Sequence, residues 1–333
     1  SEQLTYIAKI LHRRNSSDEF SNLIQSAKNE LLDTEQNSNN QLFIKGKERN
    51  INLLIKEFNK AKNLDPKLVE SLAKAKSKGY ESWQEAKKKS DFKVFLPFFE
   101  ELVKLRIEEA KQISDQYSPW ETLAQPFEPE LTLKWLNKMF QPLKDTLPEL
   151  IRGINKSKKY HWDLSPESQH NLCSKLLDEF GRDKDLVVVG KSPHPFSITL
   201  GPNDYRITTR IVEGEPLSSF LATAHEWGHS IYEQGLPSQS HQWFAWPLGQ
   251  ATSMGIHESQ SLFWENRIVK SKSFSKRFFK KFVSAGCTLN NYFELWKSIN
   301  HLEAGLNRVE ADELTYGLHI LIRTELEIDL IEG

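Results

Sequence analysis

The sequence predicts a mostly α-helical protein with one small β-sheet, placed directly before a helix that carries a His-Glu-x-x-His motif. Apolar residues recur every three or four positions over most of the chain, which is the period of an amphipathic helix. Only residues 185–211 depart from this period, with β-branched runs and alternation that favour short strands. Because elements that follow one another in sequence are usually neighbours in space, we expect the sheet to lie beside the motif helix.

Composition excludes several classes of protein. The 333 residues carry a formal net charge of −1, with 38% hydrophobic and 27% charged residues, as in ordinary soluble globular proteins. This balance indicates no nucleic-acid or membrane partner, and no apolar run reaches the roughly 18 residues of a membrane span. Cys173 and Cys287 form no C-x-x-C pair, which argues against a disulfide framework or a thiolate zinc site. We therefore expect a cytoplasmic protein.

Helical periodicity dominates residues 1–184. Asp65-Pro66 is typical of a helix start, and Pro97 indicates either a kink or the true beginning of its helix. The prolines at 119, 126 and 129 predict a turning segment. The expected helices of this part are Leu4–Arg13, Phe20–Leu32, Leu42–Lys62, Lys67–Lys78, Phe92–Ile113, Leu131–Ser157 and Pro166–Phe180.

The predicted sheet consists of a hairpin and one further strand. Strands are expected over Leu186–Val189, Phe196–Leu200 and Tyr205–Ile211, with Gly201–Asp204 as the turn between the last two. An edge strand of such a sheet could pair with an extended peptide through its backbone. An equally weighted alternative is that the sheet only caps the helical core.

The helix expected over Leu217–Gln234 carries the residues suited to metal chemistry. His225 and His229 are four positions apart, so both imidazoles project from one face and can share one zinc ion. Glu226 beside them can take a proton from the metal's water, and Gly228 leaves room above the helix. The pattern therefore predicts two ligands and a general base.

A hydrolytic zinc site needs a third protein ligand from elsewhere and an open fourth position for water. Glu258 is the candidate, in a helix expected over Gly249–Val269. His257 and Glu258 are adjacent, so on a helix they point about 100° apart and cannot easily bind the same ion. We therefore assign Glu258 as the ligand and His257 as a hydrogen-bond partner behind the ligands. Without the preceding motif, a solvated His-Glu pair would be the plainer interpretation.

The rest of the chain is again helical, with helices expected over Phe274–Phe293 and Leu302–Leu330. Arg308 lies near the start of the second one. Judged on the residues alone, its simplest role is a surface ion pair with Glu310 or Asp312.

Five blocks in order carry a family resemblance. They are His194-Pro-Phe196, Asp204–Arg210, His225–His229, Gly255–Ser261 and Arg308–Tyr316. With them the chain resembles the M32 metallocarboxypeptidases, the Taq carboxypeptidase family, over nearly its whole length. The resemblance implies a zincin-like multi-helix fold with a substrate groove.

The resemblance also implies an activity, a cofactor and an assembly. The activity is zinc-dependent removal of the C-terminal residue from peptides that have a free carboxylate, with broad specificity. One Zn²⁺ ion is expected per chain, with Co²⁺ also effective, and the full-length protein is expected to be a homodimer.

Site residues carry over from the matching blocks. The resemblance implies that His225, His229 and Glu258 bind the metal and that Glu226 is the general base. Arg308 would bind the substrate's terminal carboxylate, a role that suits an always-charged guanidinium. Arg206 and His194 would line the groove. His257, Tyr316 and Asp312 would orient their neighbours.

Two other functions stay open at this point. A non-catalytic metal-binding helical protein would usually fill all four zinc positions with protein ligands, often cysteine. A zinc endopeptidase of the oligopeptidase type would not need Arg308 for a terminal carboxylate.

The chain is expected to be a single unit, residues 1–333, with a helical part over 1–184 and the sheet and metal-site helices over 185–333. It begins with Ser1 and ends directly after a helical run, whereas family members have segments before and after these points. We therefore expect a fragment truncated at both ends, with reduced or no activity alone, because a missing oxyanion donor costs about 10²–10³-fold in kcat.

Overall fold

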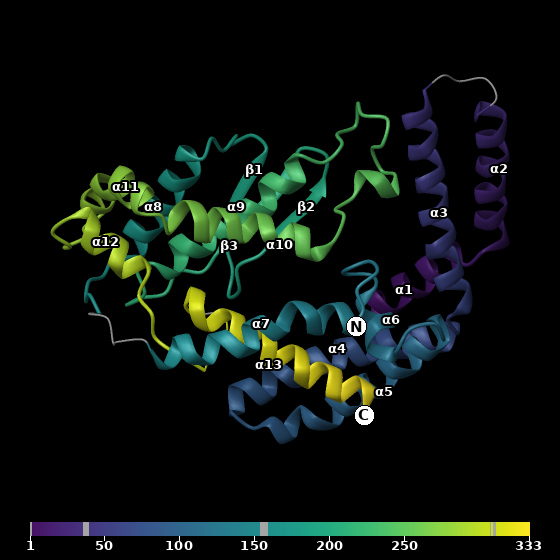
Figure 1. Cartoon of the computed structure of the whole chain (residues 1–333), viewed down its shortest axis with the longest axis horizontal. Helices are drawn as coiled ribbons and strands as arrows, with labels where there is room; N and C mark the ends of the chain where they lie inside the picture. Colours follow the sequence, from purple (N-terminus) through teal and green to yellow (C-terminus); the bar gives the residue numbers. More distant parts are fainter. Residues whose placement is uncertain (1, 36–39, 154–158, 307, 309–310) are drawn as a thin grey trace. The chain divides into compact units, whose positions relative to one another are not determined.

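The computed structural model describes residues 2–35, 40–153, 159–306, 308 and 311–333. Helices account for most of these residues and the described strands form one sheet of three, so the predicted mostly α-helical class is confirmed (Figure 1). No helix among them is long and apolar enough to cross a membrane. The chain divides into two compact units, each described here by itself.

The first unit comprises Ser1–Leu133, Trp246–Leu248 and Thr324–Gly333. Its elements up to residue 133 are helices, one of them a short 3-10 helix. They are α1 (Glu2–Asn15), α2 (Asp18–Glu35), α3 (Gln41–Asn63), α4 (Pro66–Lys89), η1 (Phe92–Val94), α5 (Leu96–Ile113) and α6 (Pro119–Ala124). An apolar cluster of Ile24, Leu31, Ile44 and Ile51 holds α2 against α3.

The helix bounds correct the sequence prediction in this unit at three points. α4 continues to Lys89 instead of ending at Lys78, and α5 begins at Leu96 with Pro97 in its first turn, so this proline starts the helix and does not kink it. Only a turn was expected where α6 lies. Ser118 and Glu121 form a reciprocal capping box there, which satisfies the first backbone N–H groups of this short helix.

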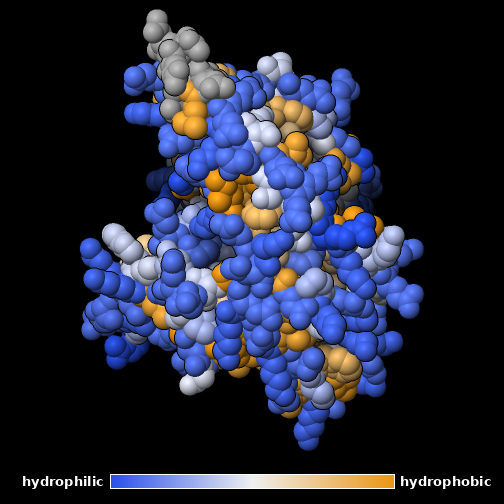
Figure 2. All heavy atoms as spheres, turned by 90° about the vertical axis from the view of Figure 1, so that its right-hand side faces the viewer, coloured by the Kyte–Doolittle hydropathy of each residue, from blue (hydrophilic) through white to orange (hydrophobic). Residues whose placement is uncertain are grey.

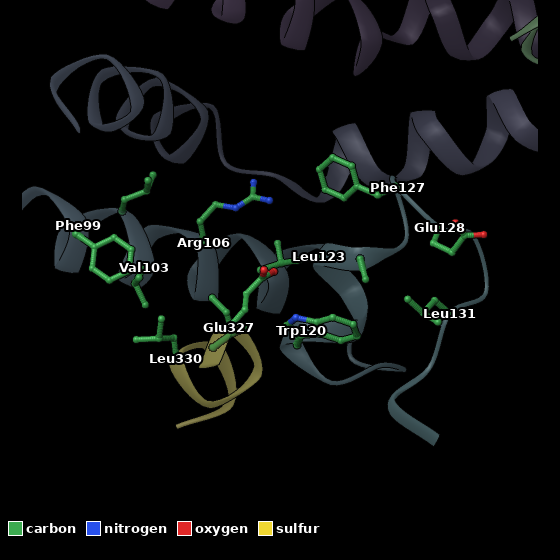
Figure 3. Close-up of a pocket in the computed structure, with 13 residues that line it drawn as sticks. Phe99, Val103, Arg106, Trp120, Leu123, Phe127, Glu128, Leu131, Glu327 and Leu330 are labelled. Atoms are coloured by element: carbon green, nitrogen blue, oxygen red, sulfur yellow. The ribbon is translucent and has the colours of Figure 1, made fainter. Parts of the chain in front are cut away.

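An apolar cavity of about 410 Å³ lies within this unit (Figure 3). Side chains of α5, α6 and the end of α13 (Glu313–Glu332) line it, among them Phe99, Trp120 and Leu330. The Glu332 carboxylate accepts hydrogen bonds from the Ser118 hydroxyl at 2.7 Å and the Trp120 N–H at 2.8 Å, which ties the end of α13 to α6. The lining contains none of the predicted site residues.

Several helices of the first unit expose apolar side chains. On α1, the exposed fractions of Leu4, Tyr6 and Ile7 are 63%, 66% and 51%, and Leu42 at the start of α3 is 82% exposed. Figure 2 shows apolar side chains between hydrophilic ones on the face that it displays. Single exposed apolar residues are normal, but several on one helix are typical of a surface that contacts other protein.

The second unit comprises Lys134–Ala245 and Gly249–Arg323, and α13 belongs to it up to Arg323. Its other elements are helices and the strands of the sheet, with η2 at the boundary. They are α7 (Leu133–Arg152), α8 (Pro166–Glu179), β1 (Val187–Lys191), β2 (Ser197–Gly201), β3 (Asp204–Thr209), α9 (Ser218–Gln234), the 3-10 helix η2 (Pro247–Gly249), α10 (Met254–Leu262), the π-helix η3 (Phe263–Val269), α11 (Lys272–Ser284) and α12 (Tyr292–Ile299).

The sheet is the predicted hairpin with one further strand. Its order is β1-β3-β2, with β3 antiparallel to β2 and parallel to β1. Asn203 takes a positive φ of 63° in the tight turn, a conformation that asparagine tolerates. Val187 and Ile207 point from β1 and β3 into a buried cluster with Trp227 of α9. The sheet is therefore fastened to the helix that carries the histidine motif, as the sequence predicted.

An aromatic core holds the other side of α9. Phe220 is fully buried against Phe274, Phe278 and Phe282 of α11, with ring centroids 4.9 Å apart for the pair Phe220–Phe282. Burying a Phe side chain contributes about 1.5–3 kcal/mol. α9 is thus clamped between this core and the Trp227 cluster, which makes it the rigid centre of the unit.

Two predicted helices of the second unit are wrong in extent. The helix expected over Phe274–Phe293 is two helices, because the chain turns at Gly286 with a φ of +109°. The helix expected from Leu302 begins only at Glu313. Asp312 precedes it, and its carboxylate accepts from the backbone N–H groups of Leu314 and Thr315 at 2.9 Å each.

Gly228 lets α9 and α10 approach each other with no side chain between them. A Cβ atom at this position would lie 2.4 Å from Cα of Ser261 and 2.6 Å from the carbonyl oxygen of Gln260. Both are backbone atoms of α10, so no side-chain rotation could relieve the clash. The space above the motif helix that the sequence predicted is therefore filled by α10.

Replacing Gly228 by alanine should destabilise the protein by about 1–3 kcal/mol, because α10 must move away. Gly79→Ala is the matched control, since a Cβ at this α4 position meets no atom within 4 Å. The control should be stabilised by about 0.5–1 kcal/mol, the usual gain for Gly to Ala inside a helix. Urea unfolding of both variants checks this, and equal stability of the two would contradict the close-contact interpretation.

Candidate functional site

α9 presents His225 and His229 from one face, with their ring centroids 4.9 Å apart. The start of this helix is held by buried hydrogen bonds. The Ser219 hydroxyl donates to the Gln169 side chain at 3.0 Å, and the Thr209 hydroxyl donates to the Ser219 carbonyl at 3.0 Å. A helix anchored to α8 and β3 in this way keeps both imidazoles in fixed positions.

α10 brings Glu258 to these imidazoles. Its carboxylate lies 3.2 Å from Nε2 of His229 and 3.7 Å from Nε2 of His225. One ligand atom from each of the three residues lies within 4.8 Å of the others, and this is the one group of metal-ligating side chains found among the described residues. The structure therefore brings together the three ligands that the sequence predicted.

Glu265 lies behind His225. Its carboxylate accepts a hydrogen bond from Nδ1 of His225 at 3.0 Å and contacts the Lys270 ammonium at 3.4 Å. Burial alone would raise the pKa of Glu265, but the hydrogen bond and the Lys270 charge outweigh it and lower the pKa. Because Glu265 is ionised, it accepts the Nδ1 proton of His225 and leaves the Nε2 lone pair toward Glu258.

His257 lies behind His229 in the corresponding place. Its Nδ1 is 2.7 Å from Nδ1 of His229, and its Nε2 is 2.8 Å from the Glu233 carboxylate. With the carboxylate accepting from Nε2 of His257, the hydrogen-bond network leaves Nδ1 of His257 as the acceptor of the His229 proton. This assignment, made from the hydrogen-bond network, again leaves a lone pair on Nε2 of His229.

The three ligand groups fit a divalent cation. Two imidazole Nε2 atoms and one carboxylate face one another, and each imidazole is oriented by a partner on its other nitrogen. Burial raises the pKa of Glu258 and the adjacent imidazoles lower it, with a net shift downward, so this carboxylate is ionised. Two neutral imidazoles and one carboxylate form a donor set typical of catalytic zinc sites.

Glu226 is buried beside the cluster, with 7% of its surface exposed. Burial raises the pKa of its carboxyl group, and the neighbouring imidazoles lower it only in part. A carboxyl group of raised pKa next to a cation site is suited to take a proton and to release it again. This arrangement is the one that a general base requires.

Arg308 and Tyr316 form a pair near the cluster. Nη1 of Arg308 donates to the Tyr316 hydroxyl at 3.3 Å, and its guanidinium lies 5.8 Å from the centre of the ring. The pKa of Tyr316 is raised, first by burial and then by the charges of Glu258 and Glu265, so the phenol lies within electrostatic reach of the site. Glu310 lies outside the described residues. Asp312 caps α13.

Arg206 and His194 are both exposed. On β3 the neighbouring Ile207 points to Trp227, and successive side chains of a strand alternate, so Arg206 lies on the sheet face away from α9. There it forms a bidentate pair with Asp204 at 2.9 and 3.0 Å. Within the described residues, no hydrogen bond or ion pair joins either residue to the metal-ligand cluster.

Sequence reasoning missed three residues of the site, Glu233, Glu265 and Lys270. Glu233 has a detectable signal, because it follows His229 by four positions and continues the same stripe of α9. The signal for Glu265 is weaker, since it follows Glu258 by seven positions and a π-helix lies between them. Lys270 has no sequence signal, because it acts only through Glu265.

The comparisons with known proteins agree on one family. The model of the Carboxypeptidase Taq (M32) metallopeptidases matches residues 1–333. Thermostable carboxypeptidase 1 of Thermus thermophilus is 35% identical over 295 residues, which cover 83% of this chain and 57% of that protein. Carboxypeptidase 1 of Bacillus subtilis is 36% identical over 263 residues, 75% of this chain and 51% of that protein. The chain thus spans about half the length of these relatives.

Solved structures agree at the level of the fold. The crystal structure of BsuCP matches with a TM-score of 0.88 at 30% identity, over 99% of this chain and 66% of that chain. Metallocarboxypeptidase 1 of Trypanosoma cruzi matches with a TM-score of 0.84 at 28% identity, over 97% and 64% of the two chains. Together with the family model, these matches show that the chain belongs to the Carboxypeptidase Taq (M32) metallopeptidase family.

Proposed function

We propose that the protein is a zinc-dependent carboxypeptidase that hydrolyses the last peptide bond of peptides with a free C-terminal carboxylate. The observation that carries the proposal is the cluster of His225, His229 and Glu258 with the buried Glu226 beside it. Family membership and relatives named carboxypeptidases support cleavage at the C-terminal end of the peptide. Broad specificity is part of the same proposal.

The metal would be held by Nε2 of both histidines and by the Glu258 carboxylate. Zinc suits this donor set, and cobalt is the natural spectroscopic substitute. When bound, such an ion supplies Lewis acidity, which polarises the scissile carbonyl and makes water easier to deprotonate. One ion per chain is expected from the one cluster among the described residues.

Glu226 carries the proton in the proposed reaction. Its raised pKa allows the carboxylate to take a proton from the attacking water and to hold it while the carbonyl carbon becomes tetrahedral. The same carboxyl group then gives the proton to the departing amine. Burial supports this role, since bulk water cannot easily exchange the proton before it is transferred.

Arg308 would restrict the reaction to the C-terminal end of the peptide. A guanidinium that binds the terminal carboxylate through two hydrogen bonds brings only the last peptide bond to the metal site. The position of Tyr316 within reach of both the arginine and the site carboxylates supports this role. Arg206 and His194 remain predictions as groove residues, because their described contacts lie away from the cluster.

A cytoplasmic location and a homodimer stay predictions. Both cysteines are free and buried, which supports the reducing compartment expected from the sequence. Light scattering after size-exclusion chromatography would test the dimer.

Metal analysis tests the site itself. The wild-type protein should bind one zinc ion per chain, and His225→Ala combined with Glu258→Ala should reduce this close to zero. The matched control changes the exposed His161 and Glu167 of the same unit to alanine and should leave the stoichiometry at one. A double variant of the cluster that still binds one ion would contradict the assignment.

Glu226→Gln should lower kcat by about 10²–10⁴-fold while zinc stoichiometry stays at one, because the amide cannot accept the proton and is not a ligand. Equal loss of zinc and activity would instead make Glu226 part of the metal site.

Arg308→Met should lower kcat/KM for an N-blocked dipeptide by about 10–100-fold, the effect of losing a hydrogen bond to a charged group. The amidated dipeptide should be a poor substrate of the wild type and should be little affected by the substitution. Arg267→Met, at an exposed arginine 3.5 Å from Glu313, is the control. Equal cleavage of the free and amidated peptides by the wild type would favour the endopeptidase alternative.

A further inference from the structure

We propose that Glu265 is a positioning residue for the metal ligand His225, aimed by the π-helix η3 and balanced in charge by Lys270. This inference rests on the proposed function, because it assumes that the cluster binds a metal. It adds a residue that acts through His225 and does not contact the ion.

The π-helix explains how Glu265 reaches His225. A π-turn contains more residues than an α-turn, so each residue rotates the chain by less than the 100° of an α-helix. Trp264 and Glu265 can therefore both face α9. The ring centroid of Trp264 lies 4.6 Å from that of Phe180 and 6.4 Å from that of Trp227. The Glu265 carboxylate lies 3.0 Å from Nδ1 of His225. π-turns within helices are frequent at functional sites.

Lys270 makes the burial of Glu265 tolerable. The Glu265 side chain is 19% exposed and the Lys270 side chain is 10% exposed. Burying either charge without the other would cost free energy of folding. Two hydrogen bonds fix the backbone of Lys270. Its N–H donates to the Glu265 carbonyl at 3.1 Å, and its carbonyl accepts from the Asn300 side chain at 2.9 Å. A carboxylate fixed in this way can hold an imidazole in one orientation.

The two imidazoles have unlike partners. His225 faces an anionic carboxylate, whereas His229 faces the imidazole ring of His257, with the Glu233 carboxylate one step further away. A negative charge next to Nδ1 increases the electron density at Nε2. His225 is therefore the more strongly supported ligand, and metal affinity should depend on the charge of Glu265 as well as on its hydrogen bond.

The test compares Glu265→Gln and Glu265→Ala in zinc affinity, measured by competition with a chelator. Loss of such a partner typically weakens metal binding about 10–100-fold. The glutamine keeps an acceptor and loses the charge, so it should bind zinc about 10-fold more weakly than the wild type, and the alanine about 100-fold more weakly. The visible spectrum of the cobalt-loaded protein should change in the alanine variant, because the His225 ring is no longer oriented.

Glu179→Gln is the matched control. Glu179 is 18% exposed in the same unit and is paired with Arg277 and Lys281, so its loss tests the general effect of removing a partly buried ion pair. The zinc affinity of the Glu179→Gln variant should equal that of the wild type. Glu265 variants that bind zinc as tightly as the wild type would overturn the positioning role. A wild type that binds no zinc would overturn the proposed metal site itself. If Glu265→Ala does not fold, Glu265→Gln decides the question alone.

Discussion

The contact of α10 with α9 at Gly228 is the constraint on which the geometry of the candidate metal ligands depends. The two helices approach so closely that a single methyl group would meet the backbone of Gln260 and Ser261. Glu258 lies one turn earlier on α10, and only this approach brings its carboxylate to 3.2 Å from His229. α9 itself cannot yield, because the Phe220 core and the Trp227 cluster bury it on two sides. The geometry of the candidate ligand set is therefore defined by packing of the backbone and not by flexible side chains.

That packing concentrates charge that water would otherwise screen. Glu226, Glu258 and Glu265 share a partly buried space in which Lys270 is the cation that pairs with Glu265. Burial lowers the pKa of His225, but the three carboxylates raise it further than burial lowers it. The raised pKa of His225 has the sign expected of a site with an excess of negative charge. A divalent cation at the three ligands would balance that excess, so the electrostatics and the donor set favour the same occupant.

Sequence reasoning succeeded where the decisive interactions are local. The spacing of His225 and His229 and the small sheet before them follow from residue periodicity alone, and both are found in the structure. It failed where one residue changes the path of the chain. Gly286 takes a positive φ and divides an expected long helix, and Asp312 starts α13 later than its apolar pattern indicates. Glu265 was missed for a related reason, because a π-turn alters which face a residue occupies without changing the composition that predicts a helix.

Because α13 begins only at Glu313, Arg308 is not part of this helix. This matters for how Arg308 could bind the terminal carboxylate of a substrate. Arg308 lies ahead of α13, and its carbonyl accepts a hydrogen bond from the backbone N–H of Ala311 at 3.2 Å. Its guanidinium donates to the Tyr316 hydroxyl. The Asp312 carboxylate caps α13 and also accepts from the backbone N–H of Glu303 at 3.1 Å. Asp312 thus links Glu303 to the start of α13, and under the proposed function it would affect a substrate only through Arg308. If Arg308 binds the terminal carboxylate as proposed, a guanidinium held by one tyrosine hydroxyl can adjust to terminal residues of different size. Such an adjustable group fits a peptidase of broad specificity better than one of narrow specificity.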